Sequence, residues 1–148
     1  MIIAIDGSAA SGKGTLSKQL AQHLGLAYLD TGALYRAVAL VLLNAGENLQ
    51  TITENQCVDC CSQLDFELTN SPLIRNENVA MMASKVAAIP TVRAALLNLQ
   101  RKFAANPPSS KGAILDGRDI GTTVLPDADI KFFIDAEINI RAKRRTKE

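Results

Sequence analysis

The nine residues GSAASGKGT near the start of the chain carry its clearest chemical pattern. Gly7, Gly12 and Lys13 match the phosphate-binding pattern G-x-x-x-x-G-K-[ST], but Gly14 stands where the hydroxyl belongs and Thr15 supplies it one residue later. In such a loop, backbone N–H groups and a helix N-terminus bind phosphate, and the lysine reaches the outer phosphates. We therefore expect this loop to bind a nucleotide, with the Thr15 hydroxyl available to Mg²⁺.

A phosphate loop is meaningful only between a strand and a helix, and the sequence offers both. Residues 2–6, IIAID, form a short apolar run typical of a buried parallel strand. Leu16, Leu20 and Leu24 recur on one face of a helix that Gly25 is expected to end. This context makes a chance match of three residues a poor explanation.

A carboxylate, Asp116, follows the apolar run 113–115 and is predicted to stand at the carboxyl end of a strand. On its own it would be read as a turn residue that caps the next backbone groups. Together with a phosphate loop, we expect it to face Mg²⁺ through a water molecule, because such acids lie at this end of a parallel sheet.

Six arginines could neutralise phosphate charge, and each could equally be solvated surface charge. They are Arg36, Arg93, Arg118, Arg141, Arg144 and Arg145. Arg118 favours the first interpretation, since it lies in DGRD, two residues after the predicted strand end. The run RAKRR (141–145) could bind nucleic acid, but a net charge of +1 and the lack of interleaved aromatic residues disfavour it.

The remaining pattern predicts an α/β protein with a parallel sheet flanked by helices. Further strands are expected at 26–30 and 130–134, a helix from Thr31 to a stop at Gly46, and a basic helix after 134. The middle reads as helical, with a capping box at Thr53 and Gln56 and helices at 77–88 and 91–105. Residues 66–69, FELT, alternate like an exposed strand.

Composition sets the broad class of the protein. The chain has 148 residues, 47% of them hydrophobic, with no apolar run long enough to span a membrane and no signal-peptide pattern, so we expect a cytoplasmic protein. Cys57, Cys60 and Cys61 could suggest zinc or redox chemistry, but His23 is the only histidine and is distant in sequence. Their spacing favours packed helix residues.

Four stretches together resemble a known family. GxxxxGKGT resembles the loop of the nucleoside monophosphate kinases, and residues 28–36 (YLDTGALYR), 83–101 and 115–129 (LDGRDIGTTVLPDAD) are similar to the bacterial cytidylate kinases. The resemblance implies a P-loop NTPase fold and transfer of the ATP γ-phosphate to CMP or dCMP with Mg²⁺. It implies a P-loop core at 1–45 and 106–137, a mostly helical acceptor-binding insertion at 46–105, and the start of a lid at 138–148.

The resemblance also implies roles for individual residues. The ATP-binding loop would comprise Gly7, Ser8, Ala9, Ala10, Ser11, Gly12, Lys13, Gly14 and Thr15. The CMP-binding residues would be Thr31, Tyr35, Arg36, Ser84, Arg93, Arg118 and Asp119, with Ser84, Arg93 and Asp119 around cytosine. Lys13, Arg36 and Arg118 would be catalytic, Thr15 and Asp116 would face the metal, and Arg141, Arg144 and Arg145 would begin the lid.

The sequence departs from the family pattern in two places. The segment 66–78 is shorter than in many relatives, and the chain ends where the family continues. We therefore expect a gene product about half as long again, and slow or no turnover by these 148 residues alone.

Three alternative functions stay open. They are a related kinase for UMP, AMP or shikimate, a nucleotide-binding module without transfer activity, and an RNA-binding protein. We expect a monomer that binds no nucleic acid and no membrane.

Overall fold

The computed structural model describes residues 1–145, which divide into two compact units. One unit contains residues 1–30 and the chain from Gln100 onward, and the other contains residues 31–99. The predicted domain limits, which divide the chain near 45 and 106, stay a prediction. Each unit is described by itself below.

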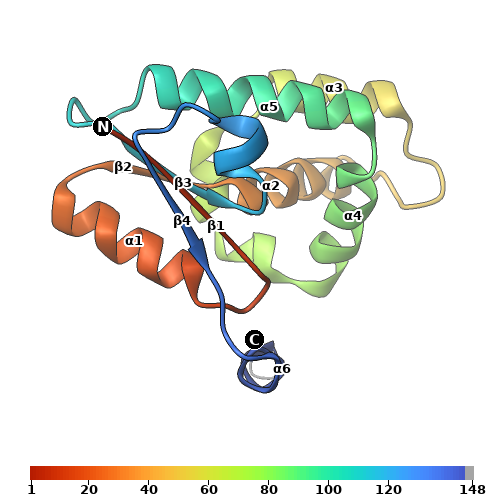
Figure 1. Ribbon diagram of the computed structural model, residues 1–148. Helices are drawn as coiled ribbons and strands as arrows, with labels where there is room; N and C mark the ends of the chain where they lie inside the picture. Colours follow the sequence, from red (N-terminus) through yellow and green to blue (C-terminus); the bar gives the residue numbers. More distant parts are fainter. Residues whose placement is uncertain (146–148) are drawn as a thin grey trace. The chain divides into compact units, whose positions relative to one another are not determined.

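The first unit is built on a four-stranded parallel sheet, as predicted (Figure 1). The strands are β1 (Ile2–Gly7), β2 (Ala27–Asp30), β3 (Ala113–Gly117) and β4 (Ile130–Ile134), in the order β2-β3-β1-β4. Because all four run the same way, their carboxyl ends meet at one edge of the sheet. In that register Asp30 lies opposite Asp116, and Asp6 lies opposite Gly117.

Burial differs sharply between the strands. The central strands β1 and β3 are buried along almost their whole length, which explains why their sequences are continuous apolar runs. The edge strand β4 is equally apolar, IKFFI, yet its first four residues are exposed. Its outer edge pairs with no strand among residues 1–145, which leaves that edge of the sheet open.

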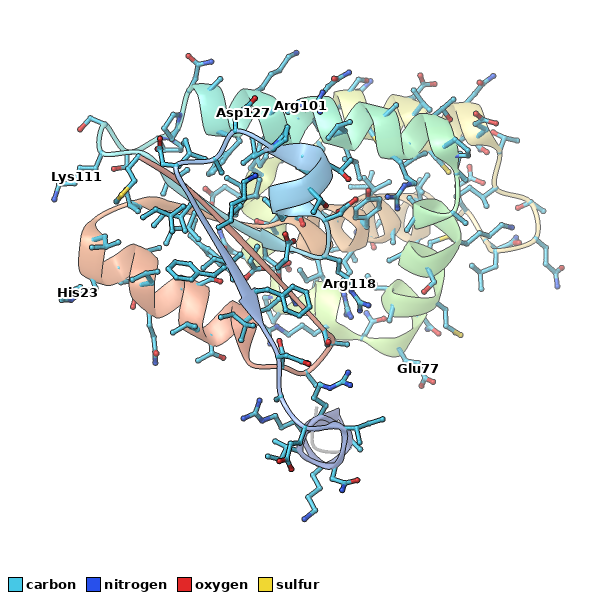
Figure 2. All side chains as sticks on the ribbon, in the orientation of Figure 1. His23, Glu77, Arg101, Lys111, Arg118 and Asp127 are labelled. Atoms are coloured by element: carbon cyan, nitrogen blue, oxygen red, sulfur yellow. The ribbon has the colours of Figure 1, made fainter. Side chains whose placement is uncertain are left out.

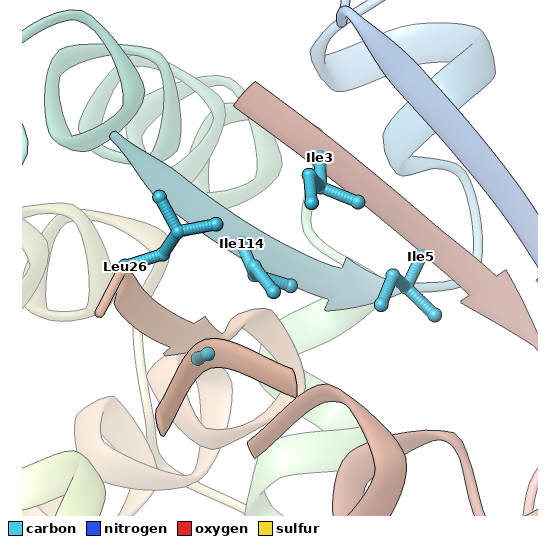
Figure 3. Close-up of a cluster of buried hydrophobic side chains, with 5 residues drawn as sticks. Ile3, Ile5, Leu26 and Ile114 are labelled. Carbon is cyan, nitrogen blue, oxygen red and sulfur yellow. The ribbon is translucent and has the colours of Figure 1, made fainter. Parts of the chain in front are cut away.

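Helix α1 (Lys13–Leu24) covers one face of this sheet and completes its core. Ile3, Ile5 and Ile114 from the two central strands pack with Ala21 of α1 and with Leu26, which precedes β2 (Figure 3). Gly25 ends the helix as predicted, because its left-handed backbone (φ 69°) lets its N–H return to the carbonyl of Ala21.

Two shorter helices follow the later strands of this unit. After β3 the chain makes a single π-helical turn, η3 (Ile120–Val124), which the sequence did not predict. After β4 it continues into α6 (Ile138–Arg145), the expected basic helix. Figure 1 shows α6 beyond the carboxyl end of β4. The start of η3 lies near the end of β1, because the N–H groups of Ile120 and Gly121 donate to Asp6.

The second unit, residues 31–99, is helical. It contains α2 (Thr31–Asn44), α3 (Glu54–Ser62), α4 (Glu77–Ala87) and most of α5 (Pro90–Ala105). The buried helix α2 is central, since α3 and α4 both pack against it.

The predicted capping box at the start of α3 is confirmed. The Thr53 hydroxyl accepts from the backbone N–H of Gln56, and the Gln56 side chain accepts from the N–H of Thr53. Cys57 and Cys61 are buried in α3.

The prediction of a strand at 66–69 is wrong. Residues Phe66–Asn70 form a 3₁₀-helix, η1, and Pro72–Arg75 form another, η2. The Asp65 carboxylate accepts from the backbone N–H of Glu67, and Ser71 does the same for Leu73, so each side chain starts a helical turn. An alternating pattern of only four residues is a weak indication of a strand, and here the two capping side chains favour helical turns instead.

Within the described residues, no single helix is both long and apolar enough to cross a membrane. Only α4 and α5 taken together satisfy the requirements of length and composition, and these two helices are bent by 99° at the break between them.

Candidate functional site

The phosphate loop connects β1 to α1 through a backbone that turns sharply. Ala10 (φ 58°) and Gly12 (φ 93°) both adopt the left-handed conformation, and the N–H of Ser11 donates to the carbonyl of Ser8 at 3.3 Å. Gly12 lies directly before the first residue of α1, Lys13. The loop therefore ends at a helix N-terminus whose first N–H groups have no partner within the helix, which is the arrangement that binds phosphate.

Two glycines in the loop serve different purposes. A Cβ on Gly7 would lie 2.1 Å from the carbonyl oxygen of Ile134 in β4, so only glycine fits at that position. A Cβ on Gly14 would make ordinary contacts, 3.6 Å from an Asp116 carboxylate oxygen and 3.8 Å from the Tyr28 hydroxyl. The conformation of Gly14 thus does not demand glycine, but its position brings the loop directly over Asp116.

One hydroxyl of the loop is buried without a protein partner. The side chain of Ser11 is 6% exposed, and its oxygen makes no hydrogen bond to any described residue. Leaving a buried hydroxyl unsatisfied costs about 1–3 kcal/mol. A phosphate oxygen at the loop would satisfy this hydroxyl, so the orphaned group is a physical sign that the loop accommodates a ligand.

Asp116 is a buried carboxyl group with several neighbours. Its side chain is 2% exposed, and the Tyr28 hydroxyl donates to it at 2.8 Å. Burial, and secondarily the negative charge of Asp30, raises the pKa of Asp116 to about 6. The Tyr28 hydrogen bond, the positive charge of Lys13 and the Ser17 hydroxyl oppose that rise. The charge of Lys13 thus acts on the Asp116 carboxyl group.

The candidate lid residues approach the loop from α6. The Arg144 guanidinium donates to the carbonyls of Ala10 at 3.2 Å and Ser11 at 2.9 Å. Arg141 donates to the carbonyl of Ala136 at 2.9 Å. The structure thus ties α6 to the backbone of the loop. Arg145 belongs to α6, but its side chain lies outside the described part of the chain.

A hollow of about 670 Å³ adjoins the loop in this unit. Its walls include Gly12, Thr15, Leu16, Gln19, Ile134 and Arg144. Binding sites for small ligands usually measure about 300–1,000 Å³. A hollow of this size next to a phosphate loop has room for the nucleoside part of a bound nucleotide.

The predicted acceptor residues are divided between the two units. Arg118 and Asp119 directly follow β3 in the first unit, and Arg118 is exposed (labelled in Figure 2). The other five, Thr31, Tyr35, Arg36, Ser84 and Arg93, belong to the second unit. There Arg36 donates to the carbonyl of Ile74 at 3.2 Å, and Ser84 and Arg93 are exposed on α4 and α5. Their joint role in one acceptor site stays a prediction.

Sequence reasoning gave no role to two charged residues that the structure connects to the segment after β3. Asp6 is 8% exposed, and its carboxylate accepts from the N–H groups of Ile120 and Gly121. Arg101 donates to two carbonyls at the other end of the same turn. The only signal in the sequence was an acid at the end of the apolar run IIAID.

The donor set fits Mg²⁺ only in combination with a nucleotide. Among the described residues, no three His, Cys, Asp or Glu side chains form a metal-binding group. Mg²⁺ in phosphoryl-transfer sites usually takes one or two carboxylates, with phosphates and water completing its shell. Asp116, with Asp30 opposite it in the sheet, offers such a partial set.

Comparison with known proteins decides the family. The sequence model of cytidylate kinase matches residues 3–148. The chain belongs to the cytidylate kinase family. The cytidylate kinases of Afipia carboxidovorans and of Rhodopseudomonas palustris strain BisB18 are each 54% identical to it over 148 residues, which cover 100% of this chain and 68% of each relative. That of Paramagnetospirillum magneticum is 52% identical, over 99% of this chain and 69% of its own length. The expected resemblance to cytidylate kinases is confirmed.

Proposed function

We propose that the chain is a cytidylate kinase, which transfers the γ-phosphate of ATP to CMP or dCMP and releases ADP with CDP or dCDP. The family match supports the reaction class. The observation that carries the proposal is the phosphate loop, whose buried Ser11 hydroxyl has no hydrogen-bond partner among the described residues. No described feature favours another acceptor or an inactive nucleotide-binding module.

The donor would bind along the loop from Gly7 to Thr15. Its phosphates would meet the N–H groups at the start of α1, the Lys13 ammonium and the Ser11 hydroxyl. The 670 Å³ hollow would hold the nucleoside part. Arg144, which now donates to two loop carbonyls, would exchange these contacts for phosphate oxygens when the lid forms.

Mg²⁺, when bound, would neutralise charge on the transferring phosphates. Thr15 and Asp116 would hold it, the latter through water. Asp116 lies behind Gly14 and accepts from Tyr28, which fixes the direction of its carboxylate.

The acceptor would need no activated protein nucleophile, because a phosphate oxygen of CMP is already ionised at neutral pH. Arg36 and Arg118 would hold that phosphate, and Lys13 with these arginines would stabilise the transferring group. Ser84, Arg93 and Asp119 would recognise cytosine by hydrogen bonds, since the base offers a donor amino group and acceptors at its carbonyl and ring nitrogen. Thr31 would also hold the nucleotide, and Tyr35 would pack on the acceptor.

The proposed partners are therefore ATP, Mg²⁺ and CMP or dCMP, in pyrimidine nucleotide metabolism. With a net charge of +1, the chain lacks the excess of positive charge that is typical of proteins that bind nucleic acid. We propose that it acts as a monomer in the cytoplasm.

The function is tested with the variant Lys13→Ala, made in the protein as it is expressed in the cell. The measured quantity is the CMP-dependent release of ADP. We expect a loss of about a thousandfold or more in kcat, because the lysine acts on charge that develops during transfer. Lys18→Ala is the matched control, since Lys18 is exposed on the same helix, and it should keep the rate of the unaltered protein. A Lys13→Ala variant with a near-native rate would refute the assignment.

A further inference from the structure

The residues proposed for the acceptor, Arg118 and Asp119, run directly into the π-helical turn η3. The carbonyl of Asp119 accepts from the N–H groups of Thr123 at 2.8 Å and Val124 at 3.1 Å, and Ile120 accepts from Leu125 at 2.7 Å. Single π-helical turns such as this one are rare in proteins. Asp119 is thus part of the hydrogen-bonded turn, and whatever holds the turn also holds Asp119.

The N-terminal end of η3 is bound by a carboxylate from another strand. One oxygen of Asp6 accepts from the N–H of Ile120 at 2.7 Å, and the other accepts from the N–H of Gly121 at 2.8 Å. Both donors would otherwise be unsatisfied at the start of a helical turn. Because Asp6 is 8% exposed and lies in β1, these charge-assisted bonds connect η3 to a buried part of the sheet.

The C-terminal end of η3 is bound by a guanidinium from α5. Arg101 donates through Nε to the carbonyl of Val124 and through Nη2 to the carbonyl of Thr123, each at 3.0 Å (Arg101 is labelled in Figure 2). Both carbonyls lie at the end of the turn, where no following helical N–H group can donate to them. An anion at the start and a cation at the end also match the direction of the backbone dipoles in the turn.

We propose that Asp6 and Arg101 are positioning residues for the acceptor: by holding both ends of η3 they fix the backbone from which Arg118 and Asp119 reach CMP. The inference rests on the proposed function, because it concerns the acceptor of that reaction. In this proposal neither residue contacts the nucleotide, because both side chains bind the backbone of η3. Asp6 immediately precedes the phosphate loop, so one buried carboxylate connects the strand that leads into the ATP loop with the segment that carries the acceptor residues.

The test separates acceptor binding from donor binding in Asp6→Asn and Arg101→Ala. Asparagine keeps one acceptor oxygen but turns an NH₂ group toward the second N–H, so one bond is lost. We expect the KM and the directly titrated Kd for CMP to rise about tenfold in Asp6→Asn and about threefold in Arg101→Ala, with those for ATP within about twofold of the unaltered protein. Arg101→Lys keeps one donor and should partly restore CMP affinity.

The matched control is Lys102→Ala, an exposed neighbour on α5, which should leave both constants unchanged. A merely structural role would lower the active fraction, and with it kcat, without separating CMP from ATP. Suppose that the unaltered protein phosphorylates CMP, but the two variants change the KM and Kd for CMP and for ATP equally, or change neither. That result would overturn this inference and leave the proposed function standing. An unaltered protein that does not phosphorylate CMP would instead refute the proposed function.

Discussion

Asp116, which we propose faces Mg²⁺ through water, is a residue whose charge lowers the stability of the fold. It is buried beside Asp30, and the Tyr28 hydroxyl, the Lys13 charge and Ser17 oppose the rise in its pKa. Sequence reasoning found Asp116 from its place after an apolar run, because that signal is local. Tyr28 could not be found in this way, since its hydroxyl reaches Asp116 only across the two paired strands.

The pH dependence of stability should reveal this cost. The pKa of Asp116 rises from 3.8 to about 6 on folding, so the folded protein binds the proton more tightly and loses stability as pH rises from about 4 through about 6. Asp116→Asn has no such ionisation. With a chelator present to remove Mg²⁺, the melting temperature of Asp116→Asn should exceed that of the unaltered protein at pH 7.5. The two melting temperatures should converge near pH 4. A variant that melts lower at pH 7.5 would contradict this account.

At the scale of elements, prediction succeeded where local chemistry decides the structure. The Thr53–Gln56 capping box and the Gly25 helix end are formed by residues close together in sequence, and both were predicted. The segment 66–69 was predicted wrongly, because Asp65 starts a helical turn that four alternating residues could not reveal. The turn η3 was missed for another reason: Asp6 and Arg101 are distant from it in sequence.

The capping box gives a prediction for α3. Thr53→Ala removes the hydroxyl that accepts from the N–H of Gln56, so we expect the free energy of unfolding to fall by about 1 kcal/mol. Thr51→Ala, at an exposed position in the preceding turn, should change it by less than about 0.5 kcal/mol. Urea unfolding of both variants measures the difference, and equal values for the two would rule out a stabilising cap.

At the scale of the whole molecule, the sequence revealed the α/β class and the parallel sheet but not how much of β4 would be exposed. An apolar run is compatible with a central strand or an edge strand, and only the strand order tells them apart. Phe132 is 44% exposed and Phe133 is 70% exposed, although their sequence resembles that of a buried strand. The division into two units likewise leaves the joint acceptor site as a prediction.

The exposed face of β4 should limit the solubility of the 148-residue chain. We expect Phe133→Lys to raise the protein concentration at which light scattering begins, because a charge on an edge strand discourages pairing between sheets. Its melting temperature should change little, since the Phe133 ring is mostly in solvent. Leu73→Lys replaces an apolar residue that is 60% exposed and lies outside the sheet, and it should have the smaller effect. A similar gain from both variants would argue against the edge strand as the cause.

The most direct test of the central claim is a panel of acceptors offered with ATP and Mg²⁺ to the chain as the cell makes it. The panel contains CMP, dCMP, UMP, AMP and shikimate, and the measured quantity is acceptor-dependent release of ADP. Our account predicts the highest kcat/KM with CMP or dCMP. A preference for AMP or shikimate would contradict the proposed acceptor, and ATP binding without transfer to any acceptor would contradict the proposed activity.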